Sequence, residues 1–179
     1  FPLDYWPLLK GHAQAQGLDP FVVAALAAQE STFDARIRSS ANAVGLMQII
    51  PPTGRRLARS VGMRNFTEQS LQNPEVNARL GTRYFGDMVK EFGGYHFALA
   101  GYNAGEYRVI RDGYRVPQIR ETQNYVKTIT ARYYGRAPKR KLIVTYGKST
   151  LTEEDKAQVV QLAYATTDDR GTDSMSNIY

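Results

Sequence analysis

The stretch Phe21 Val22 Val23 Ala24 Ala25 Leu26 Ala27 Ala28 Gln29 Glu30 is apolar over its first eight residues and ends in a carboxylate. A segment that is apolar on every side is typical of a helix buried inside a protein. Asp19 and Pro20 precede it, and these residue types are preferred as the N-cap and first residue of a helix. A carboxylate at the end of a buried helix must be paired, solvated or kept protonated, because an isolated charge is costly to bury. Glu30 is therefore the first candidate for a functional group.

The residues around Glu30 suit it to donate a proton. Val23 and Ala27 share a helical face with Glu30, because residues three and four apart lie one above the other on a helix. Apolar neighbours and the negative end of the helix dipole both disfavour the ionised form, so we expect the carboxyl to stay protonated long enough to act as a general acid. Taken alone, the residue is better interpreted as an ordinary glutamate at a fraying helix end.

Helical patterns with clear start and stop signals continue through most of the chain, and strand signals are weak before Gly135. Proline or an N-cap residue opens several of these segments, and glycine closes them. The pattern predicts a mainly α-helical protein. Besides the buried helix, we expect helices over residues 4–16, 51–62, 73–92, 95–104 and 118–134, the last closed by Gly135.

The character of the chain changes after Gly135, where we place a domain boundary. We expect one domain over residues 1–135 and a C-terminal extension of unknown role over residues 136–179. The extension contains a candidate strand, a candidate capped helix and a polar tail that we expect to be loose. These segments are Leu142–Tyr146, Thr152–Ala165 and Thr166–Tyr179.

The amino-acid composition excludes several kinds of structure and active site. The 179 residues are 42% hydrophobic and 11% aromatic, which is enough for one globular core, and no apolar run approaches the ~20 residues of a membrane helix. The absence of cysteine excludes disulfides, thiolate zinc sites and a cysteine nucleophile. His12 and His96 are the only histidines and lack the spacing of paired metal ligands. We therefore expect no metal and no cofactor.

The net charge of +6 favours anionic partners, which include nucleic acid, acidic membrane surfaces and acidic polysaccharides. The basic residues look scattered along the sequence, and no nucleic-acid recognition motif accompanies them, so we expect no nucleic-acid partner. The tight cluster Arg136, Lys139, Arg140 and Lys141 is interpreted as a solvated linker. Phe1 is not an initiator methionine, so we interpret the chain as a processed protein or an excised domain.

A second pattern, Gly45 Leu46 Met47 Gln48 Ile49, has the residue types of a sugar-binding loop. Glycine lets the backbone approach a ligand closely, methionine offers adaptable apolar contact, and glutamine both donates and accepts hydrogen bonds. Taken alone, the stretch is better interpreted as a helix entry with a flexible start.

Two further patterns combine an aromatic ring with polar groups. Tyr102 and Asn103 lie within Gly101 Tyr102 Asn103 Ala104 Gly105, a glycine-bounded stretch that by itself is merely a turn. Glu121 and Tyr125 are four residues apart in Glu121 Thr122 Gln123 Asn124 Tyr125 Val126 and share a helical face. By itself this segment is better interpreted as a solvated helix surface with Tyr125 half-buried.

Taken in order, the four patterns resemble the ESxF, GLMQI, (A/G)YNAG and ETxxYV motifs of the soluble Slt-type lytic transglycosylases, enzymes that cut bacterial peptidoglycan. The resemblance spans roughly residues 5–135, and four ordered matches are specific where each one alone is weak. Gly101 is a small departure, because alanine is commoner there, and we expect it only to loosen the helix. The resemblance implies a lysozyme-like, mainly α fold with two lobes and a substrate cleft. It also implies peptidoglycan glycan strands as partner and a place in the periplasm or at the cell surface.

The resemblance also implies how the reaction runs. Glu30 corresponds to the sole catalytic acid and base, acting on the β-1,4 bond between N-acetylmuramic acid and N-acetylglucosamine. The 2-acetamido group of the sugar takes the part of the second carboxylate of other glycosidases, and the product is a 1,6-anhydromuramyl end. The substrate-binding residues implied by the same motifs are Ser31, Met47, Gln48, Tyr102, Asn103, Glu121 and Tyr125.

Two alternatives remain at this point. A hydrolase of the same fold, a muramidase, needs Asp34 or Glu121 to position a water molecule. A non-catalytic wall-binding scaffold is disfavoured, because Glu30 and the flanking motif residues are all present. The extension after Gly135 is an accessory wall-binding segment, a contact to another domain, or a segment packed against the domain, and we favour packing.

Overall fold

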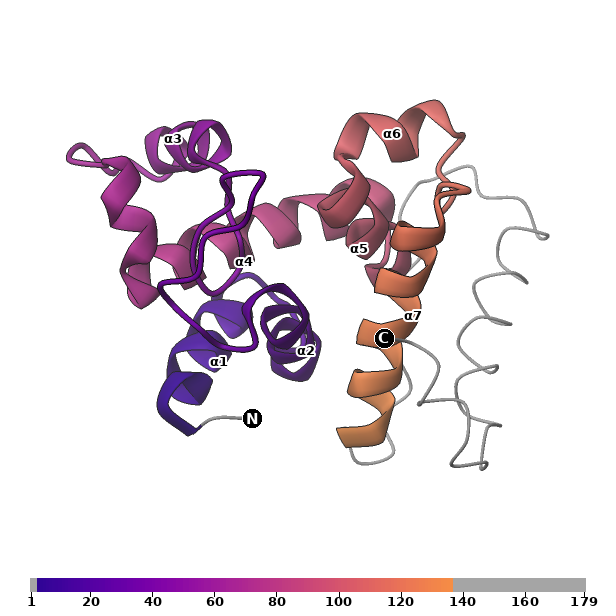
Figure 1. The fold of residues 1–179 in the computed structure, drawn as a ribbon, viewed down its shortest axis with the longest axis horizontal. Helices are drawn as coiled ribbons and strands as arrows, with labels where there is room; N and C mark the ends of the chain where they lie inside the picture. The colour runs from indigo at the N-terminus through magenta and orange to yellow at the C-terminus, as the bar shows by residue number, and fades with distance from the viewer. Residues whose placement is uncertain (1–2, 137–179) are drawn as a thin grey trace. The chain divides into compact units, whose positions relative to one another are not determined.

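The computed structural model describes residues 3–136, and its regular structure there is helical (Figure 1). Within this range the only β-type pairings are isolated bridges, Arg38 with Val44 and Val44 with Ile49. The prediction of a mainly α protein is therefore confirmed. In chain order the elements are η1 (Leu3–Tyr5), α1 (Trp6–Ala15), α2 (Pro20–Ser31), α3 (Pro51–Ser60), η2 (Glu68–Gln72), α4 (Pro74–Phe92), α5 (Tyr95–Ala104), α6 (Glu106–Arg111) and α7 (Arg120–Arg136).

The chain divides into two compact units, Phe1–Asp87 and Met88–Tyr179, and the α4 segment contributes residues to both. Each unit contains its own buried residues and is described by itself. None of the helices in the described part of the chain is both long enough and apolar enough to cross a membrane.

The core of the first unit is built on α2. Its residues from Val22 to Ala27 are at most 2% exposed, because the helix is apolar on all sides. The predicted cap is confirmed, since the Oδ1 atom of Asp19 accepts a hydrogen bond from the backbone N–H of Phe21 at 2.9 Å. Helix α1 packs against α2, and the rings of Trp6 and Phe21 lie 5.1 Å apart between centroids. The most apolar stretch of the sequence thus becomes the centre of this unit.

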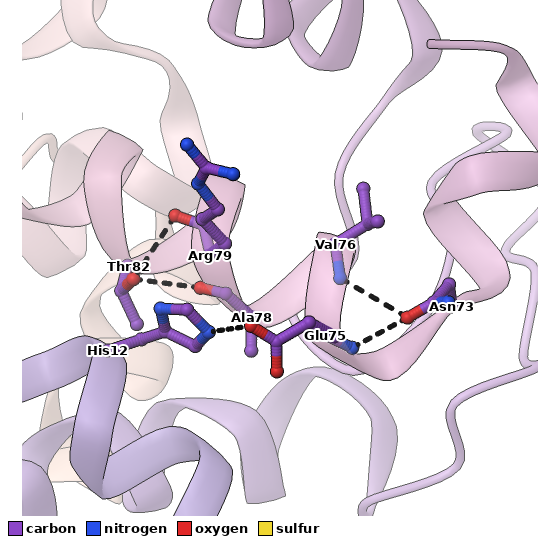
Figure 2. Close-up of polar contacts among 7 residues, drawn as sticks. All are labelled: His12, Asn73, Glu75, Val76, Ala78, Arg79 and Thr82. Atoms are coloured by element: carbon purple, nitrogen blue, oxygen red, sulfur yellow. Dashed lines mark hydrogen bonds and ion pairs between the residues drawn. The ribbon is translucent and has the colours of Figure 1, made fainter. Parts of the chain in front are cut away.

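Polar contacts fix the start of α4 and attach α1 to it (Figure 2). The side chain of Asn73 accepts hydrogen bonds from the N–H groups of Glu75 and Val76 at 2.9 and 3.4 Å, which satisfies donors that a helix start leaves open. The carboxylate of Glu75 in turn lies 2.7 Å from Nε2 of His12 on α1. Asn73 is therefore the N-cap predicted from the sequence.

The second unit is organised around α5, which packs on α6 and α7. Its residues His96 to Gly101 are buried. A Cβ atom at Gly101 would lie 2.8 Å from Cε2 of Phe92, so the helix and the ring approach more closely than an alanine would allow. The expectation that Gly101 only loosens the helix is therefore wrong, because the glycine permits this packing.

Two predictions about helix limits are corrected. Helix α7 continues through Gly135 to Arg136, because a glycine inside a helix costs only about 1 kcal/mol and does not forbid helical structure. Helix α6 and the 3₁₀ segments η1 and η2 were not expected, since each is too short to show a helical period. The segments Leu142–Tyr146, Thr152–Ala165 and Thr166–Tyr179, and the basic residues 139–141, lie outside the described residues, as does nearly all of the proposed extension 136–179.

Candidate active site

Glu30 occupies the last turn of α2, one residue before the helix ends at Ser31. It is half-buried, and Val23 and Ala27 on its side of the helix are fully buried. The chain leaves the helix abruptly, because Thr32 and Phe33 both have positive φ angles, 49° and 66°. Such backbone is uncommon outside glycine and is typical of functional sites. The predicted face is confirmed, and it places one carboxyl at the boundary of an apolar core.

The side chain of Ser31 makes hydrogen bonds within the protein, and its substrate contact stays a prediction. Its side chain is buried, its Oγ donates to the carbonyl oxygens of Leu46 at 2.9 Å and Ala27 at 3.1 Å, and it accepts from the N–H of Phe33 at 3.0 Å. These contacts use the single hydrogen and a lone pair of the hydroxyl group. Ser31 therefore ties the end of α2 to the loop that contains Leu46.

The loop Gly45–Ile49 is not the start of a helix, and its glycine is not accessible to a ligand. Gly45 has φ = +79°, and a Cβ atom there would lie 2.4 Å from Nδ2 of Asn77 and 2.5 Å from the carbonyl oxygen of Leu71. The close approach that glycine permits is thus to the protein itself. The loop is a turn closed by a hydrogen bond from the N–H of Gln48 to the oxygen of Gly45 at 3.0 Å.

Asn77 on α4 holds this loop and was not predicted as a site residue. It is fully buried, its Oδ1 accepts from the N–H of Met47 at 2.8 Å, and its Nδ2 donates to the oxygens of Val44 and Leu71, both at 2.8 Å. A polar amide within an apolar helical face was the signal available in the sequence. A buried amide with three such bonds fixes the backbone of the loop.

Met47 and Gln48 point to different environments. Met47 is fully buried, and a Cβ atom at Gly81 of α4 would lie 2.5 Å from its Sδ. A side chain without exposed surface packs the loop onto α4, whereas the sugar contact of Met47 stays a prediction. Gln48 is half-buried, and its Nε2 donates to the oxygens of Gly45 at 3.0 Å and Ile37 at 3.3 Å.

These contacts bring Glu30 and Gln48 into one neighbourhood of the first unit. The hydrogen bond from Ser31 to Leu46 joins the residue after Glu30 to the residue two before Gln48. Gln48 is held by its amide nitrogen, so its amide oxygen can accept a hydrogen bond from a ligand. Asp34 is exposed, and its carboxylate accepts from the N–H of Arg36 at 2.8 Å, where it serves the turn after the helix.

The second unit gathers the polar residues of the other two motifs. The hydroxyl of Thr122 donates to Oδ1 of Asn103 at 2.7 Å, and Nδ2 of Asn103 donates to Oε1 of Glu121 at 3.2 Å. This network fixes the orientation of the Asn103 amide between α5 and α7. Thr122 is buried and was not singled out from the sequence, although it lies inside the fourth motif.

The two aromatic candidates of the second unit differ in exposure. Tyr102 is half-buried beside Asn103 in sequence. Tyr125 is only 8% exposed, whereas Glu121 one turn earlier is exposed. Both residues lie on α7 with the predicted spacing of four, and Tyr125 is more deeply buried than the half-buried position expected for it.

His96 is the clearest unassigned polar group. It is 2% exposed, and neither ring nitrogen has a hydrogen-bond partner. Burial lowers the pKa of His96 to about 4, because the apolar surroundings disfavour the charged ring. Within residues 3–136 no three His, Cys, Asp or Glu side chains lie together as metal ligands would.

The fold and these motif positions define a transglycosylase domain. The sequence profile of the family described as Transglycosylase SLT domain matches residues 7–125, which is most of the chain, and the chain belongs to this family. The predicted membership is thereby confirmed.

Relatives include the soluble lytic murein transglycosylase of Escherichia coli K12, which is 33% identical over 111 residues. That match covers 61% of this chain and 17% of the relative. The membrane-bound lytic murein transglycosylase C of Actinobacillus pleuropneumoniae is 33% identical over 91 residues, covering 50% of this chain and 25% of the relative. The matched region is thus a quarter or less of the length of these relatives.

Solved structures show the same fold. An inactive mutant of the lytic transglycosylase Slt from Pseudomonas aeruginosa, with glutamate replaced by glutamine, superposes with a TM-score of 0.69 at 31% identity, covering 74% of this chain and 24% of that one. A 70 kDa soluble lytic transglycosylase in complex with bulgecin A gives a TM-score of 0.70 at 30% identity, covering 83% and 26%. The predicted lysozyme-like fold is confirmed by these matches.

Proposed function

We propose that this domain is a peptidoglycan lytic transglycosylase in which Glu30 is the acid and then the base. The observation that carries the proposal is the position of Glu30, a half-buried carboxyl at the end of the buried helix α2. Apolar neighbours and the carboxyl end of the helix favour the protonated form needed at the start. Family membership and the glutamate-to-glutamine change in one inactive relative support the same assignment.

In the first step Glu30 protonates the oxygen that leaves C1 of N-acetylmuramic acid, and the β-1,4 bond to N-acetylglucosamine breaks. The oxygen of the muramyl 2-acetamido group stabilises the cation that develops at C1. In the second step the C6 hydroxyl of the same sugar attacks C1, and Glu30 takes the hydroxyl proton. Glu30 is restored to its starting state, a 1,6-anhydromuramyl end forms, and no water is consumed.

We assign direct sugar contacts to Gln48, Tyr102 and Asn103, the candidates that combine partial exposure with a hydrogen-bonding or stacking group. The amide of Asn103 is oriented through Glu121 and Thr122, which suits it to bind an acetamido group. Three other predicted residues support the site by packing and by hydrogen bonds to the backbone, and not by direct contact with the sugar. They are Ser31, Met47 and Tyr125, which are buried.

This proposal extends to the setting of the domain. We propose that residues 1–135 form the catalytic part and that the substrate is the glycan strand of peptidoglycan. A wall-degrading domain acts where its polymer lies, so we propose the periplasm or the cell surface.

Mass spectrometry of muropeptides released from purified peptidoglycan tests the reaction and the residue together. We expect 1,6-anhydromuramyl products from the wild-type chain and a loss of at least about 100-fold in rate from Glu30→Gln, because the amide cannot transfer the proton. Reducing-end products, heavier by one water, would show a muramidase. Equal release by the wild type and Glu30→Gln would remove Glu30 from the mechanism.

A further inference from the structure

Most of the exposed positive charge of the first unit lies in one stretch of the chain. Between Asp34 and Glu68 the sequence contains six arginines and no lysine or acidic residue, so this stretch alone has a net charge as large as the +6 of the whole chain. All six side chains are exposed. The expectation that the basic residues are scattered is therefore incomplete for this unit.

Three of these arginines form what we call the α3 arginine face, Arg55, Arg56 and Arg59. Their spacings of three and four residues place them on one side of α3. The opposite side of the helix, with Gly54, Leu57 and Ala58, is buried. Within residues 3–136 no carboxylate lies within ion-pair distance of the three guanidinium groups.

Neighbouring side chains contact the guanidinium groups on and near the α3 arginine face. The guanidinium carbon of Arg56 lies 5.5 Å from the ring centroid of Tyr84 on α4, a cation–π contact that orients the side chain. Arg38 forms an ion pair with Glu68 at 2.7 Å. The hydrogen bond from Arg38 to Glu68 and the positive charges of Arg38 and Arg55 lower the pKa of Glu68. Arg55 therefore interacts electrostatically with the same carboxylate as Arg38.

The composition of α3 indicates that the binding partner of the arginine face is an acidic polymer and not a lipid surface. A helix that binds a membrane inserts an apolar face, but the apolar residues of α3 are buried in the unit. Guanidinium groups bind carboxylates in a two-pronged geometry that suits exposed acidic side groups of a polymer. The α3 arginine face is also close in sequence to the candidate site, because α3 begins three residues after Gln48.

We propose that the α3 arginine face binds the carboxylates of the peptide stems on peptidoglycan, so that the domain prefers glycan strands that carry acidic stems over bare strands. The choice of partner rests on the proposed function. The face is a binding surface and not part of the catalytic machinery. Its removal therefore raises KM on stem-bearing substrate and leaves kcat unchanged.

The decisive experiment measures binding without cleavage, in the full chain with Glu30→Gln. Cosedimentation is compared between insoluble peptidoglycan with intact stems and the same glycan after an amidase has removed the stems. We expect Arg55→Gln/Arg56→Gln/Arg59→Gln to weaken binding to the stem-bearing polymer about tenfold, since each exposed pair contributes modestly. We expect the difference to vanish on stem-free glycan and in about 1 M salt, where the charges are screened.

A matched control removes three exposed cations elsewhere, Lys10→Gln/Arg120→Gln/Lys127→Gln. This triple has the same net charge as the first and should bind within twofold of the parent. An equal loss from both triples, a loss that persists on stem-free glycan, or unchanged binding of the face variant would each overturn the proposal.

Charge-preserving replacement separates binding from misfolding. Arg55→Lys/Arg56→Lys/Arg59→Lys should recover part of the binding that the glutamine triple loses, because lysine keeps the charge but not the bidentate geometry. Circular dichroism should show the same helix content for all variants. Failure of the lysine triple to recover any binding would contradict a charge-based surface. Because the readout is binding, it stays valid if the muropeptide experiment rejects the proposed reaction.

Discussion

Gly101 lies where a side chain would meet the ring of Phe92. A Cβ atom there would be 2.8 Å from Cε2 of a fully buried phenylalanine, and a rigid ring has little room to move. Alanine is the better helix former by about 1 kcal/mol, so two effects oppose each other. We expect the clash to prevail and Gly101→Ala to lower the free energy of unfolding by about 1 to 2 kcal/mol in urea denaturation.

Gly11 provides the matched control for this prediction. It also lies inside a helix, α1, but a Cβ atom there would meet no atom within 4 Å. Gly11→Ala should therefore raise the free energy of unfolding by up to about 1 kcal/mol. If both variants gained stability, the packing account of Gly101 would be wrong.

Asn77 is the residue whose loss we expect to be most costly for the candidate site. Asn77→Leu leaves the N–H of Met47 and the carbonyl oxygen of Leu71 without their buried partner, whereas the oxygen of Val44 keeps its hydrogen bond from the N–H of Ile49. Unsatisfied buried groups cost about 1 to 3 kcal/mol each, so we expect a loss of at least about 2 kcal/mol and a fall in peptidoglycan cleavage. Thermal unfolding followed by circular dichroism, together with muropeptide release, measures both effects.

Thr82→Val on the same helix tests whether Asn77 is special. Thr82 is equally buried, but its hydroxyl bonds only to carbonyl oxygens of its own helix, at Ala78 and Arg79 (Figure 2). The change should cost less than about 1 kcal/mol. A loss as large as that of Asn77→Leu would mean that any buried polar group on α4 matters as much.

At the scale of elements, the junction between α2 and the loop Gly45–Ile49 depends on one hydroxyl. Ser31→Ala removes the hydrogen bonds to Leu46, Ala27 and Phe33, and we expect it to cost about 1 to 3 kcal/mol. Because the junction positions Glu30 and Gln48, kcat for muropeptide release should fall while binding to peptidoglycan changes little. Ser60→Ala, which removes a single bond to Leu57 within α3, should leave both stability and kcat within error.

Several elements could be predicted from sequence because local signals decide them. The apolar run of α2 with its Asp19 cap, and the Asn73 cap of α4, are short-range features, and both are confirmed. Helix α6 has six residues, which is too few to show a period, and Gly135 was taken as a stop although glycine lowers helix stability by only about 1 kcal/mol and α7 continues to Arg136. Local pattern thus predicts where helices start better than where they end.

The helices and loops that contain the candidate residues could be predicted from the motifs, but the direction of each side chain could not. Ser31, Met47 and Tyr125 belong to the right segments, yet they are buried, because long-range partners such as Leu46 and Gly81 determine where a side chain points. Asn77 was missed for the same reason, since its three hydrogen bonds reach backbone groups that are distant in sequence. Sequence motifs therefore give the segments of the candidate site, whereas tertiary contacts determine which of their side chains are buried.

For the whole molecule, stability should depend on pH through His96. Its pKa is about 4 in the folded chain and about 6.5 in an unfolded one, so the unfolded state binds the proton first as the pH falls. The contribution is absent above pH 6.5, grows as the pH drops from about 6.5 to 4, and reaches a destabilisation of roughly 3 kcal/mol below that. Urea denaturation of the full chain between pH 4 and 7 measures it.

The His96→Phe variant isolates this contribution, because Glu68 and Asp112, whose pKa values are lowered by neighbouring arginines, also lose stabilising interactions in acid. Both carboxylates are unchanged in the variant, so the difference between the two unfolding curves reports His96 alone. We expect wild type and variant to differ by a constant amount above pH 6.5 and the gap to shift in favour of the variant as the pH falls to 4. A gap independent of pH would mean that the ring gains a partner for its proton, since only an unpaired buried imidazole has to remain neutral.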